Sequence, residues 1–532
     1  MAKNTSQNPT QSAAPRQEVP ALSEEQIRHE FSKTDRFGDF TKCALYEEVR
    51  DPRTGERQGL IHISDPYDPD GIVVSMATQA SREEVEKIVS KISPVPEFCA
   101  MLSKMAECYE LGKPLIIEGG TAVGKTFMVT KFTELLYGKG VKPLDFYCSG
   151  QTDVSDLIGK WVPREGANAE VQEKWEKFLR SEQGQNRLQQ IGDGIAKTGD
   201  ELSVEDKAKM YQAQMRTLAS EAGLTLGSEF IFQLGAIPKA FMGEYRDGNF
   251  RVREGADGFI VHIQEAGLAK PAVLNSLLRI RGEQGELAES LQLWEDSGRI
   301  VTRGPKTFVV FTNNPVDGYL DRKPIDPALS RGLEWLRFGE GLSEKSVEMT
   351  ARKICTYTLG NDQEPVSRHA TFDFRKAPEV GEAIGLAMVG IHQMLANHFN
   401  KTDQDDPQMT PVVMDNMLKV AAELQNHQVK SNGKIDVGKT LMRAITKTYL
   451  ERANPDDRSD IDKTIKERIF GKTSMSELDG KLMTLSDLLN TLASRAEGAR
   501  SVGEVGADGV KGAVTTAQNK AYFDDMKDLL EG

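Results

Sequence analysis

The sequence lacks the features of several protein classes. No apolar run approaches the roughly 18 residues that a membrane-spanning helix needs, and the N-terminal segment has no signal-peptide core. The five cysteines contain no CxxC pair, and their odd number fits free thiols in a reducing compartment better than a disulfide framework. We therefore expect a soluble cytoplasmic protein that makes no contact with a membrane.

Basic residues are also fewer than acidic residues. The chain carries 67 Lys and Arg against 80 Asp and Glu, which gives a net charge of -13. Binding to a phosphate backbone needs a basic field, so nucleic acid is the less favoured partner. Hydrophobic residues at 39% and charged residues at 28% are typical of a globular protein, and 532 residues allow roughly two to four domains.

The N-terminal part divides into a tail and a small subdomain. Residues 1–22 are polar with almost no bulky apolar side chains, which predicts a flexible tail. Residues 23–93 contain two short apolar-polar alternations around a Pro/Gly turn, which predict a β-hairpin. Ser81 and Glu84 form a capping box and predict a helix that begins near residue 82.

The remaining chain predicts an α/β core followed by helices. In residues 94–340 the apolar segments PLIIE, LDFYCSG, FIVHI and TFVVF alternate with helical patterns, which indicates a parallel sheet covered on both faces. A charged, Gln-rich and Ala-rich stretch predicts a helical insert at about 165–245. Amphipathic periodicity predicts a helical lid over residues 341–455 and a helical C-terminal extension with a tail over residues 456–532.

A glycine-rich loop between a predicted strand and a predicted helix is the strongest motif. It matches the pattern GxxxxGK[ST], in which backbone N–H groups and a helix N-terminus hold phosphate oxygens. The lysine of this pattern reaches the β- and γ-phosphates, and the hydroxyl that follows binds Mg²⁺. The sequence therefore predicts that ATP and Mg²⁺ are bound by Gly119, Gly120, Thr121, Ala122, Val123, Gly124, Lys125 and Thr126.

Hydrolysis would also need a carboxylate at the end of a second strand, and FIVHI-Gln264-Glu265 supplies one. At this point the chain resembles the AAA+ family of P-loop ATPases. Within that family it is similar to the MoxR and dynein-related group, which carries a helix-2 insert. The resemblance covers the phosphate loop, GQTDVSDLIGKWV and GADGFIVHIQEAGLAKPAVLNSLL in order. It implies a P-loop core with a helical insert and a helical lid.

The resemblance assigns roles to Glu265 and Gln264. Glu265 would activate the attacking water, with capping of the following helix as the alternative. Gln264 stands where the family usually has an Asp associated with magnesium. An amide can accept a hydrogen bond from metal-bound water but contributes no negative charge, so slow or absent hydrolysis is an open alternative.

Three further residues follow from the same resemblance. Asn314 matches sensor 1 at a strand end, although Asn before Pro is also ordinary turn chemistry. Arg331 matches the arginine finger that reaches a neighbouring subunit, although Gly332 replaces the usual Phe and a plain surface arginine is the alternative. Arg375 resembles the sensor 2 arginine of the lid.

Other features are placed by resemblance or by composition. The insert and the segment GELAESLQLWEDSGRIVTRGP resemble the helix-2 insert and the hairpin before sensor 1, which commonly line a pore; surface decoration is the alternative. His262 lies within a predicted buried strand and is interpreted as a core residue. His392 and His398 lack metalloprotease spacing, so we predict no metal site beyond nucleotide-bound Mg²⁺.

Three functions stay open at this stage. The favoured hypothesis is an AAA+ ATPase that remodels or chaperones a protein partner from a homo-oligomeric ring, by resemblance a hexamer, with a von Willebrand A-domain partner implied. The second is an ATP-binding switch or structural ring with weak or no hydrolysis, which Gln264 favours. The third is a nucleic-acid motor, against which the acidic charge counts.

Overall fold

The computed structural model covers the α/β core and parts of the regions before and after it. The predicted tail up to residue 20 and the C-terminal residues 492–532 lie outside the described part. The structure describes residues 21–35, 38–50, 55–68, 71, 73–120, 123–163, 176–197, 214, 217–218, 230–246, 248–282, 285–296, 298–315, 331–338, 342–354, 378–399, 430–431, 434–452, 455, 458–471, 475–478, 481–487 and 489–491.

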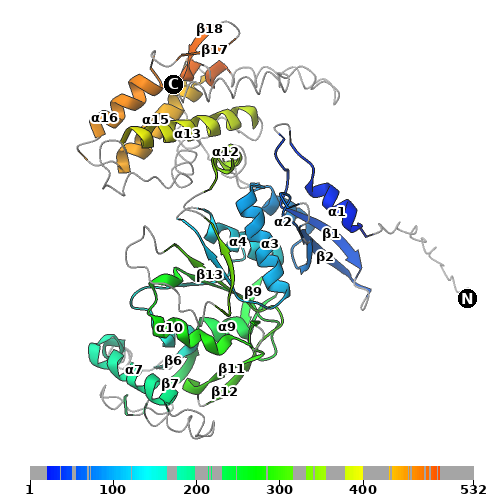
Figure 1. Ribbon diagram of the computed structural model, residues 1–532, viewed down its shortest axis with the longest axis vertical. Coiled ribbons are helices and arrows are strands. Elements are labelled where there is room, and N and C mark those ends of the chain that lie inside the picture. Colours follow the sequence, from blue (N-terminus) through cyan, green and yellow to red (C-terminus); the bar gives the residue numbers. More distant parts are fainter. Residues whose placement is uncertain are drawn as a thin grey trace, which may run out of the picture.

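A five-stranded parallel sheet forms the centre of the molecule (Figure 1). Every side chain of β10 and β13, two of its three inner strands, is buried, as expected for a parallel sheet covered on both faces. The strand order is β14-β4-β13-β10-β5, with β4 at Leu115–Glu118, β5 at Leu144–Tyr147, β10 at Ile260–Gln264, β13 at Phe308–Asn313 and β14 at Glu334–Arg337.

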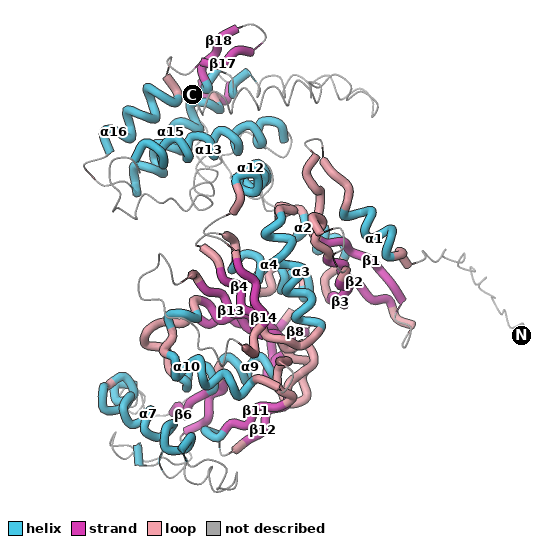
Figure 2. The backbone as a smooth tube through the Cα atoms, in the orientation of Figure 1, coloured by secondary structure: helices cyan, strands magenta, loops and turns pink. Residues whose placement is uncertain are grey.

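Helices cover both faces of this sheet (Figure 2). Side chains alternate along β13, so that Phe308 and Val310 join one hydrophobic cluster while Val309 and Phe311 join the other. The arrangement is an α/β P-loop fold. The first face carries α3 (Pro96–Glu110) and α4 (Lys125–Tyr137), and the second carries α5 (Val154–Ile158), α9 (Ala236–Phe241) and α10 (Pro271–Ser276).

The N-terminal subdomain contains the predicted hairpin and a third strand that was not predicted. Its antiparallel sheet has the order β1-β2-β3. The capping box of Ser81 and Glu84 is present at the start of α2. Its buried side chains belong to the same hydrophobic cluster as those of α3 and α4. The elements are α1 (Glu24–Phe31), β1 (Ala44–Arg50), β2 (Arg57–Ile63), β3 (Val74–Thr78) and α2 (Arg82–Val89).

The end of β3 holds the C-terminal end of α4. The last carbonyl groups of a helix have no partner within the helix. Here the hydroxyl of Thr78 donates to the carbonyl of Leu135 at 2.7 Å, and the backbone N–H of Gln79 donates to the carbonyl of Leu136 at 2.8 Å. The N-terminal subdomain therefore fixes the far end of the helix that begins at Lys125.

The predicted insertion is joined to the core by a two-stranded antiparallel sheet of β6 (Gly159–Pro163) and β7 (Phe230–Leu234). Helix α7 (Glu182–Lys197) lies between these two strands in sequence. Although α9 falls within the range expected for the insertion, its Ile237 and Phe241 are fully buried in the core.

The predicted hairpin before sensor 1 is present. The remaining short strands form the pairs β8 (Gly243–Arg246) with β9 (Asn249–Val252) and β11 (Ser290–Leu293) with β12 (Arg299–Thr302).

The described residues after position 340 form helices and two antiparallel hairpins, and the hairpins were not predicted. Strands of two to four residues have too few alternations to be recognised in the sequence. No helix in the described part of the chain combines the length and apolarity needed to cross a membrane. The elements are α12 (Glu344–Lys353), α13 (Pro378–Phe399), β15 (Lys430–Ser431), β16 (Lys434–Ile435), α15 (Val437–Arg452), α16 (Arg458–Lys463), a π-helical turn (Thr464–Ile469), β17 (Met475–Leu478) and β18 (Lys481–Thr484).

Helix α12 connects this part to the rest of the molecule. The guanidinium of Arg352 lies 2.7 Å from the buried carboxylate of Asp39 in the N-terminal subdomain. The hydroxyl of Ser346 donates to Glu97 on α3 at 2.6 Å. The start of the helical region is thus attached to both the subdomain and the core.

We predict that Phe132→Ala lowers the free energy of unfolding by about 3–5 kcal/mol, because it leaves a cavity in the core. Phe132 lies on α4, and its ring packs edge-on against Tyr109 and Phe308 with centroids 5.9 Å away from each. Chemical denaturation followed by circular dichroism measures the change. The control, Leu111→Ala at an exposed position, should stay within about 0.5 kcal/mol of the wild type. Equal losses for both variants would contradict this packing.

Candidate nucleotide-binding site

The glycine-rich loop joins the end of β4 to the start of α4. Gly124 has a left-handed backbone, with φ of 83°, and a Cβ there would lie 2.8 Å from the ring of Phe98. A Cβ at Gly119 would lie 3.1 Å from Phe338. Both positions therefore favour glycine, and no side chain caps the N-terminus of α4. The predicted loop residues Thr121 and Ala122 lie outside the described residues.

The Lys125 side chain is buried at this edge of the sheet, with the residue only 9% exposed. Its ammonium donates to the carbonyl oxygens of Gly119 at 2.6 Å and Gly120 at 2.8 Å, and to Oδ1 of Asn314 at 2.9 Å. A buried charge is tolerated only with such partners. The phosphate loop and the predicted sensor 1 residue are therefore in direct contact.

Asn314 also contacts the predicted catalytic carboxylate. Its Nδ2 donates to Oε1 of Glu265 at 3.3 Å, while its Oδ1 accepts from Lys125. The three residues come from segments that follow β4, β10 and β13, whose carboxyl ends lie at one edge of the parallel sheet. The structure thus brings together Lys125, Glu265 and Asn314.

Glu265 has an unusual backbone conformation. Its φ of 57° and ψ of 43° are left-handed, and among the described residues it alone combines a side chain with positive φ. Such a conformation costs about 1–2 kcal/mol and is often found at functional sites. Glu265 precedes the 3₁₀ turn Ala266–Leu268 but makes no side-chain capping bond to it. Glu265 therefore occupies the N-cap position of this turn through its backbone carbonyl, which accepts from the N–H of Leu268 at 2.9 Å, and not through its side chain.

Gln264 and Thr126 face each other beside the loop. The hydroxyl of Thr126 lies 3.5 Å from Oε1 of Gln264, which places the two predicted metal-associated residues together. The other end of the Gln264 amide donates from Nε2 to Oδ1 of Asp145 on β5 at 2.7 Å. Asp145 was not among the predicted site residues. Its one signal was a carboxylate inside the otherwise apolar strand LDFY.

Asp145 also contacts His262, which is fully buried on β10. Nδ1 of His262 lies 3.0 Å from the same carboxylate oxygen, and Nε2 lies 2.9 Å from the hydroxyl of Thr312. Both ring nitrogens have partners, so His262 is a satisfied core residue as predicted. Burial is the largest single influence on the pKa of Asp145 and would raise it. The hydrogen bond from His262, the attraction to His262 and the hydrogen bond from Gln264 together outweigh burial, so the pKa of Asp145 is lowered.

The two predicted arginines are not part of this cluster. Arg331 is exposed in the turn before β14, and the first residue of β14, Glu334, pairs with Leu115 at the start of β4. Arg331 therefore lies at the edge of the sheet opposite the phosphate loop and does not reach the site of its own chain. Arg375 lies outside the described residues.

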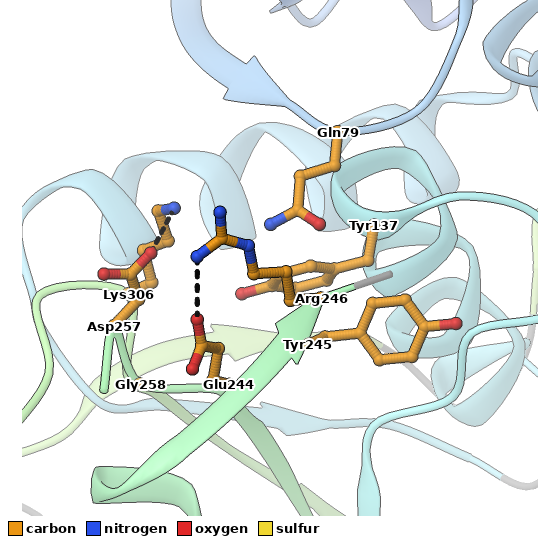
Figure 3. Close-up of a pocket in the computed structure, with 8 residues that line it drawn as sticks. All are labelled: Gln79, Tyr137, Glu244, Tyr245, Arg246, Asp257, Gly258 and Lys306. Carbon is orange, nitrogen blue, oxygen red and sulfur yellow. Dashed lines mark hydrogen bonds and ion pairs between the residues drawn. The ribbon is translucent and has the colours of Figure 1, made fainter. Parts of the chain in front are cut away.

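A separate cavity of about 190 Å³ lies at the C-terminal end of α4 (Figure 3). That end is about 18 Å from Lys125, given the 1.5 Å rise per residue of the helix. No predicted site residue lines the cavity, and its charged groups form ion pairs: Arg246 lies 4.0 Å from Glu244, and Lys306 lies 2.9 Å from Asp257. In the described part of the chain, no group of His, Cys, Asp and Glu side chains is arranged to hold a metal ion.

Comparisons with known proteins add only distant similarities. No family model matches the sequence, and no curated protein matches it. A candidate ATPase from Cytophaga hutchinsonii is 10% identical with a TM-score of 0.28, over 77% of this chain and 92% of that one. NtrX from Brucella abortus in complex with ADP is 10% identical with a TM-score of 0.25, over 81% of this chain and 68% of that one. Similarity at this distance transfers neither an activity nor a ligand to this chain.

The backbone of Glu265 generates a stability prediction. Both Glu265→Gly and Glu265→Ala remove the carboxylate, but only glycine adopts a left-handed backbone without strain. We expect the glycine variant to be more stable than the alanine variant by about 1 kcal/mol, measured by chemical denaturation. The reverse order at this position would show that the left-handed conformation is not populated in solution.

Proposed function

We propose that this protein is an AAA+-type ATPase that binds ATP with Mg²⁺ at the carboxyl edge of its central sheet and hydrolyses it. The contact of Asn314 with both Lys125 and Glu265 carries the proposal. An enzyme that splits the γ-phosphate needs a cation at the phosphate, a base near the water and a polar group between them. These three side chains lie within hydrogen-bond reach of one another.

The loop residues fit a triphosphate. Gly119 and Gly124 keep the backbone open where side chains would collide with neighbours, and the uncapped start of α4 offers N–H groups and positive potential to an anion. The ammonium of Lys125 rests on two loop carbonyls, which phosphate oxygens would replace as stronger partners.

The donor atoms beside the loop fit magnesium. Thr126 supplies a hydroxyl oxygen, and Mg²⁺ prefers oxygen ligands. The carbonyl oxygen of Gln264 would accept a hydrogen bond from a water bound to the ion. When bound, the ion would neutralise charge on the β- and γ-phosphate oxygens. Glu265 would accept the proton of the attacking water. Asn314 would hold the Glu265 carboxylate close to the γ-phosphate.

The position of Arg331 supports a ring. Because it lies opposite the phosphate loop, it can stabilise phosphoryl transfer only at the site of a neighbouring subunit, which requires a head-to-tail assembly. We propose a closed homo-oligomeric ring, a hexamer by the MoxR-like resemblance, in which Arg375 serves the lid as sensor 2. Nucleotide-dependent movement of the helical lid would remodel a protein partner, with a von Willebrand A-domain protein as a candidate.

One alternative is supported by a specific observation. Gln264 is neutral at the position where magnesium would be held, which favours an ATP-binding switch or structural ring with little turnover. The net charge of -13 favours neither hypothesis over the other, but it counts against a nucleic-acid motor. Nucleotide binding is common to all three functions.

We predict different defects for variants of the loop lysine and of the base. Lys125→Ala should weaken ATP binding at least about tenfold, because the ammonium contacts the phosphates directly. Glu265→Gln should bind ATP normally but lower the rate of phosphate release by about 10²–10⁴-fold. Equilibrium binding of a fluorescent ATP analogue and steady-state phosphate release measure the two effects. Normal binding without turnover in the wild type would instead support the switch hypothesis.

We predict that Arg331 acts across a subunit interface. Arg331→Ala should abolish turnover while ATP binding is retained. The control is Arg57→Ala, which removes an exposed arginine far from the site and should leave turnover unchanged. Mixing Arg331→Ala with Glu265→Gln subunits should restore part of the activity, because some interfaces then combine an intact Glu265 with an intact Arg331. If mixtures that exchange subunits stay inactive while the wild type turns over, Arg331 is not the residue supplied in trans.

A further inference from the structure

We propose that Asp145 is a positioning residue for magnesium, and that its carboxylate supplies, through Gln264, the negative charge that the neutral amide of Gln264 lacks. The proposal rests on the proposed ATP-binding function. Asp145 is on β5, which pairs with β10 in parallel, and it lies directly opposite His262. It therefore reaches Gln264 diagonally, along the same face of the sheet.

The contacts of Gln264 define its orientation. An amide side chain can turn either its oxygen or its nitrogen toward a neighbour, and the two ends have similar shapes. A carboxylate can only accept hydrogen bonds, so Asp145 selects the Nε2 end at 2.7 Å. The carbonyl oxygen of Gln264 is then directed toward Thr126, where it would accept a hydrogen bond from a water bound to the metal. Without Asp145, either end of the amide could face the metal position.

Asp145 is itself held in place. His262 must carry a proton on Nδ1, because the carboxylate oxygen that it contacts cannot donate. Nε2 of His262 lies 2.9 Å from the hydroxyl of Thr312, which can donate or accept. The order Thr312, His262, Asp145, Gln264 is a continuous hydrogen-bonded chain across three neighbouring strands, and it ends beside Thr126.

A hydrolytic Asp-His-Thr triad is the other chemistry that this order suggests, but burial excludes it. Thr312 is 3% exposed and His262 is 0% exposed, so no substrate reaches the hydroxyl. The last residue of this hydrogen-bonded series, Gln264, instead contacts Thr126 beside the glycine-rich loop. Its contacts thus serve to orient and polarise the amide, as outer-sphere carboxylates do for other metal ligands.

The negative charge reaches the metal position indirectly. A carboxylate that accepts from an amide N–H polarises that amide and increases the electron density on its carbonyl oxygen. About a third of the Asp145 side chain, 34%, is exposed, so solvent screens part of its charge. We therefore expect the lower end of the effect of outer-sphere residues on metal affinity, about tenfold.

The test measures how strongly Mg²⁺ improves ATP binding. The dissociation constant of a fluorescent ATP analogue is compared in EDTA and in Mg²⁺ for the wild type, for Asp145→Asn and for a double variant that combines Asp145→Asn with Gln264→Glu. We expect Asp145→Asn to reduce the Mg²⁺-dependent improvement about tenfold and to leave binding in EDTA unchanged. The double variant should restore the improvement, because the amide introduced on β5 can donate to the carboxylate introduced on β10, and the negative charge then lies on the metal side.

Two controls make the result specific. Asp257→Asn removes an exposed carboxylate that pairs with Lys306 near the other end of α4, and it should behave as the wild type. Melting temperatures establish that each variant folds, and Asp145→Ser provides the same comparison should Asp145→Asn not fold.

The outcomes separate the two proposals. An unchanged Mg²⁺ dependence in Asp145→Asn, or an equal loss of binding in EDTA and in Mg²⁺, would overturn the role of Asp145 and leave the ATP site intact. Failure of the double variant to recover would also overturn it. Absence of ATP binding in the folded wild type would overturn the proposed function, and the role of Asp145 with it.

Discussion

The buried ammonium of Lys125 is the group on which the arrangement of the site depends. It lies at the edge of the sheet where β4, β10 and β13 end, and it needs hydrogen-bond acceptors because water does not reach it freely. The loop carbonyls and Asn314 provide them. The parallel register of the strands brings these acceptors into reach, and α4 is fixed at its other end by β3 of the N-terminal subdomain.

The central sheet and the position of Lys125 could be predicted from the sequence because each has a strong local signal, whereas Glu265 and Asn314 were assigned through the AAA+ resemblance. Lys125 follows a buried strand and a glycine-rich loop, while Glu265 and Asn314 each follow a wholly buried strand. The carboxyl ends of parallel strands meet at one edge, so the contacts among these residues follow from the strand order. The third strand of the N-terminal sheet and the hairpin of β17 and β18 were missed, since short strands resemble loops.

Asp145 was missed for a different reason. Its importance depends on the pairing of β5 with β10, which brings it beside Gln264 across 119 positions of sequence, and no local pattern encodes this contact. Gln264 itself was recognised as a departure from a charged residue. The structure places a carboxylate one strand away from that departure, so the local charge is not lost from the site but displaced.

A crystal structure with a non-hydrolysable ATP analogue and Mg²⁺ would show whether one site at this edge of the sheet binds both. We expect the γ-phosphate to contact Lys125 and to lie next to Asn314 and Glu265, with the ion beside Thr126 and Gln264. A nucleotide bound elsewhere, or a triphosphate that does not contact Lys125, would contradict this expectation.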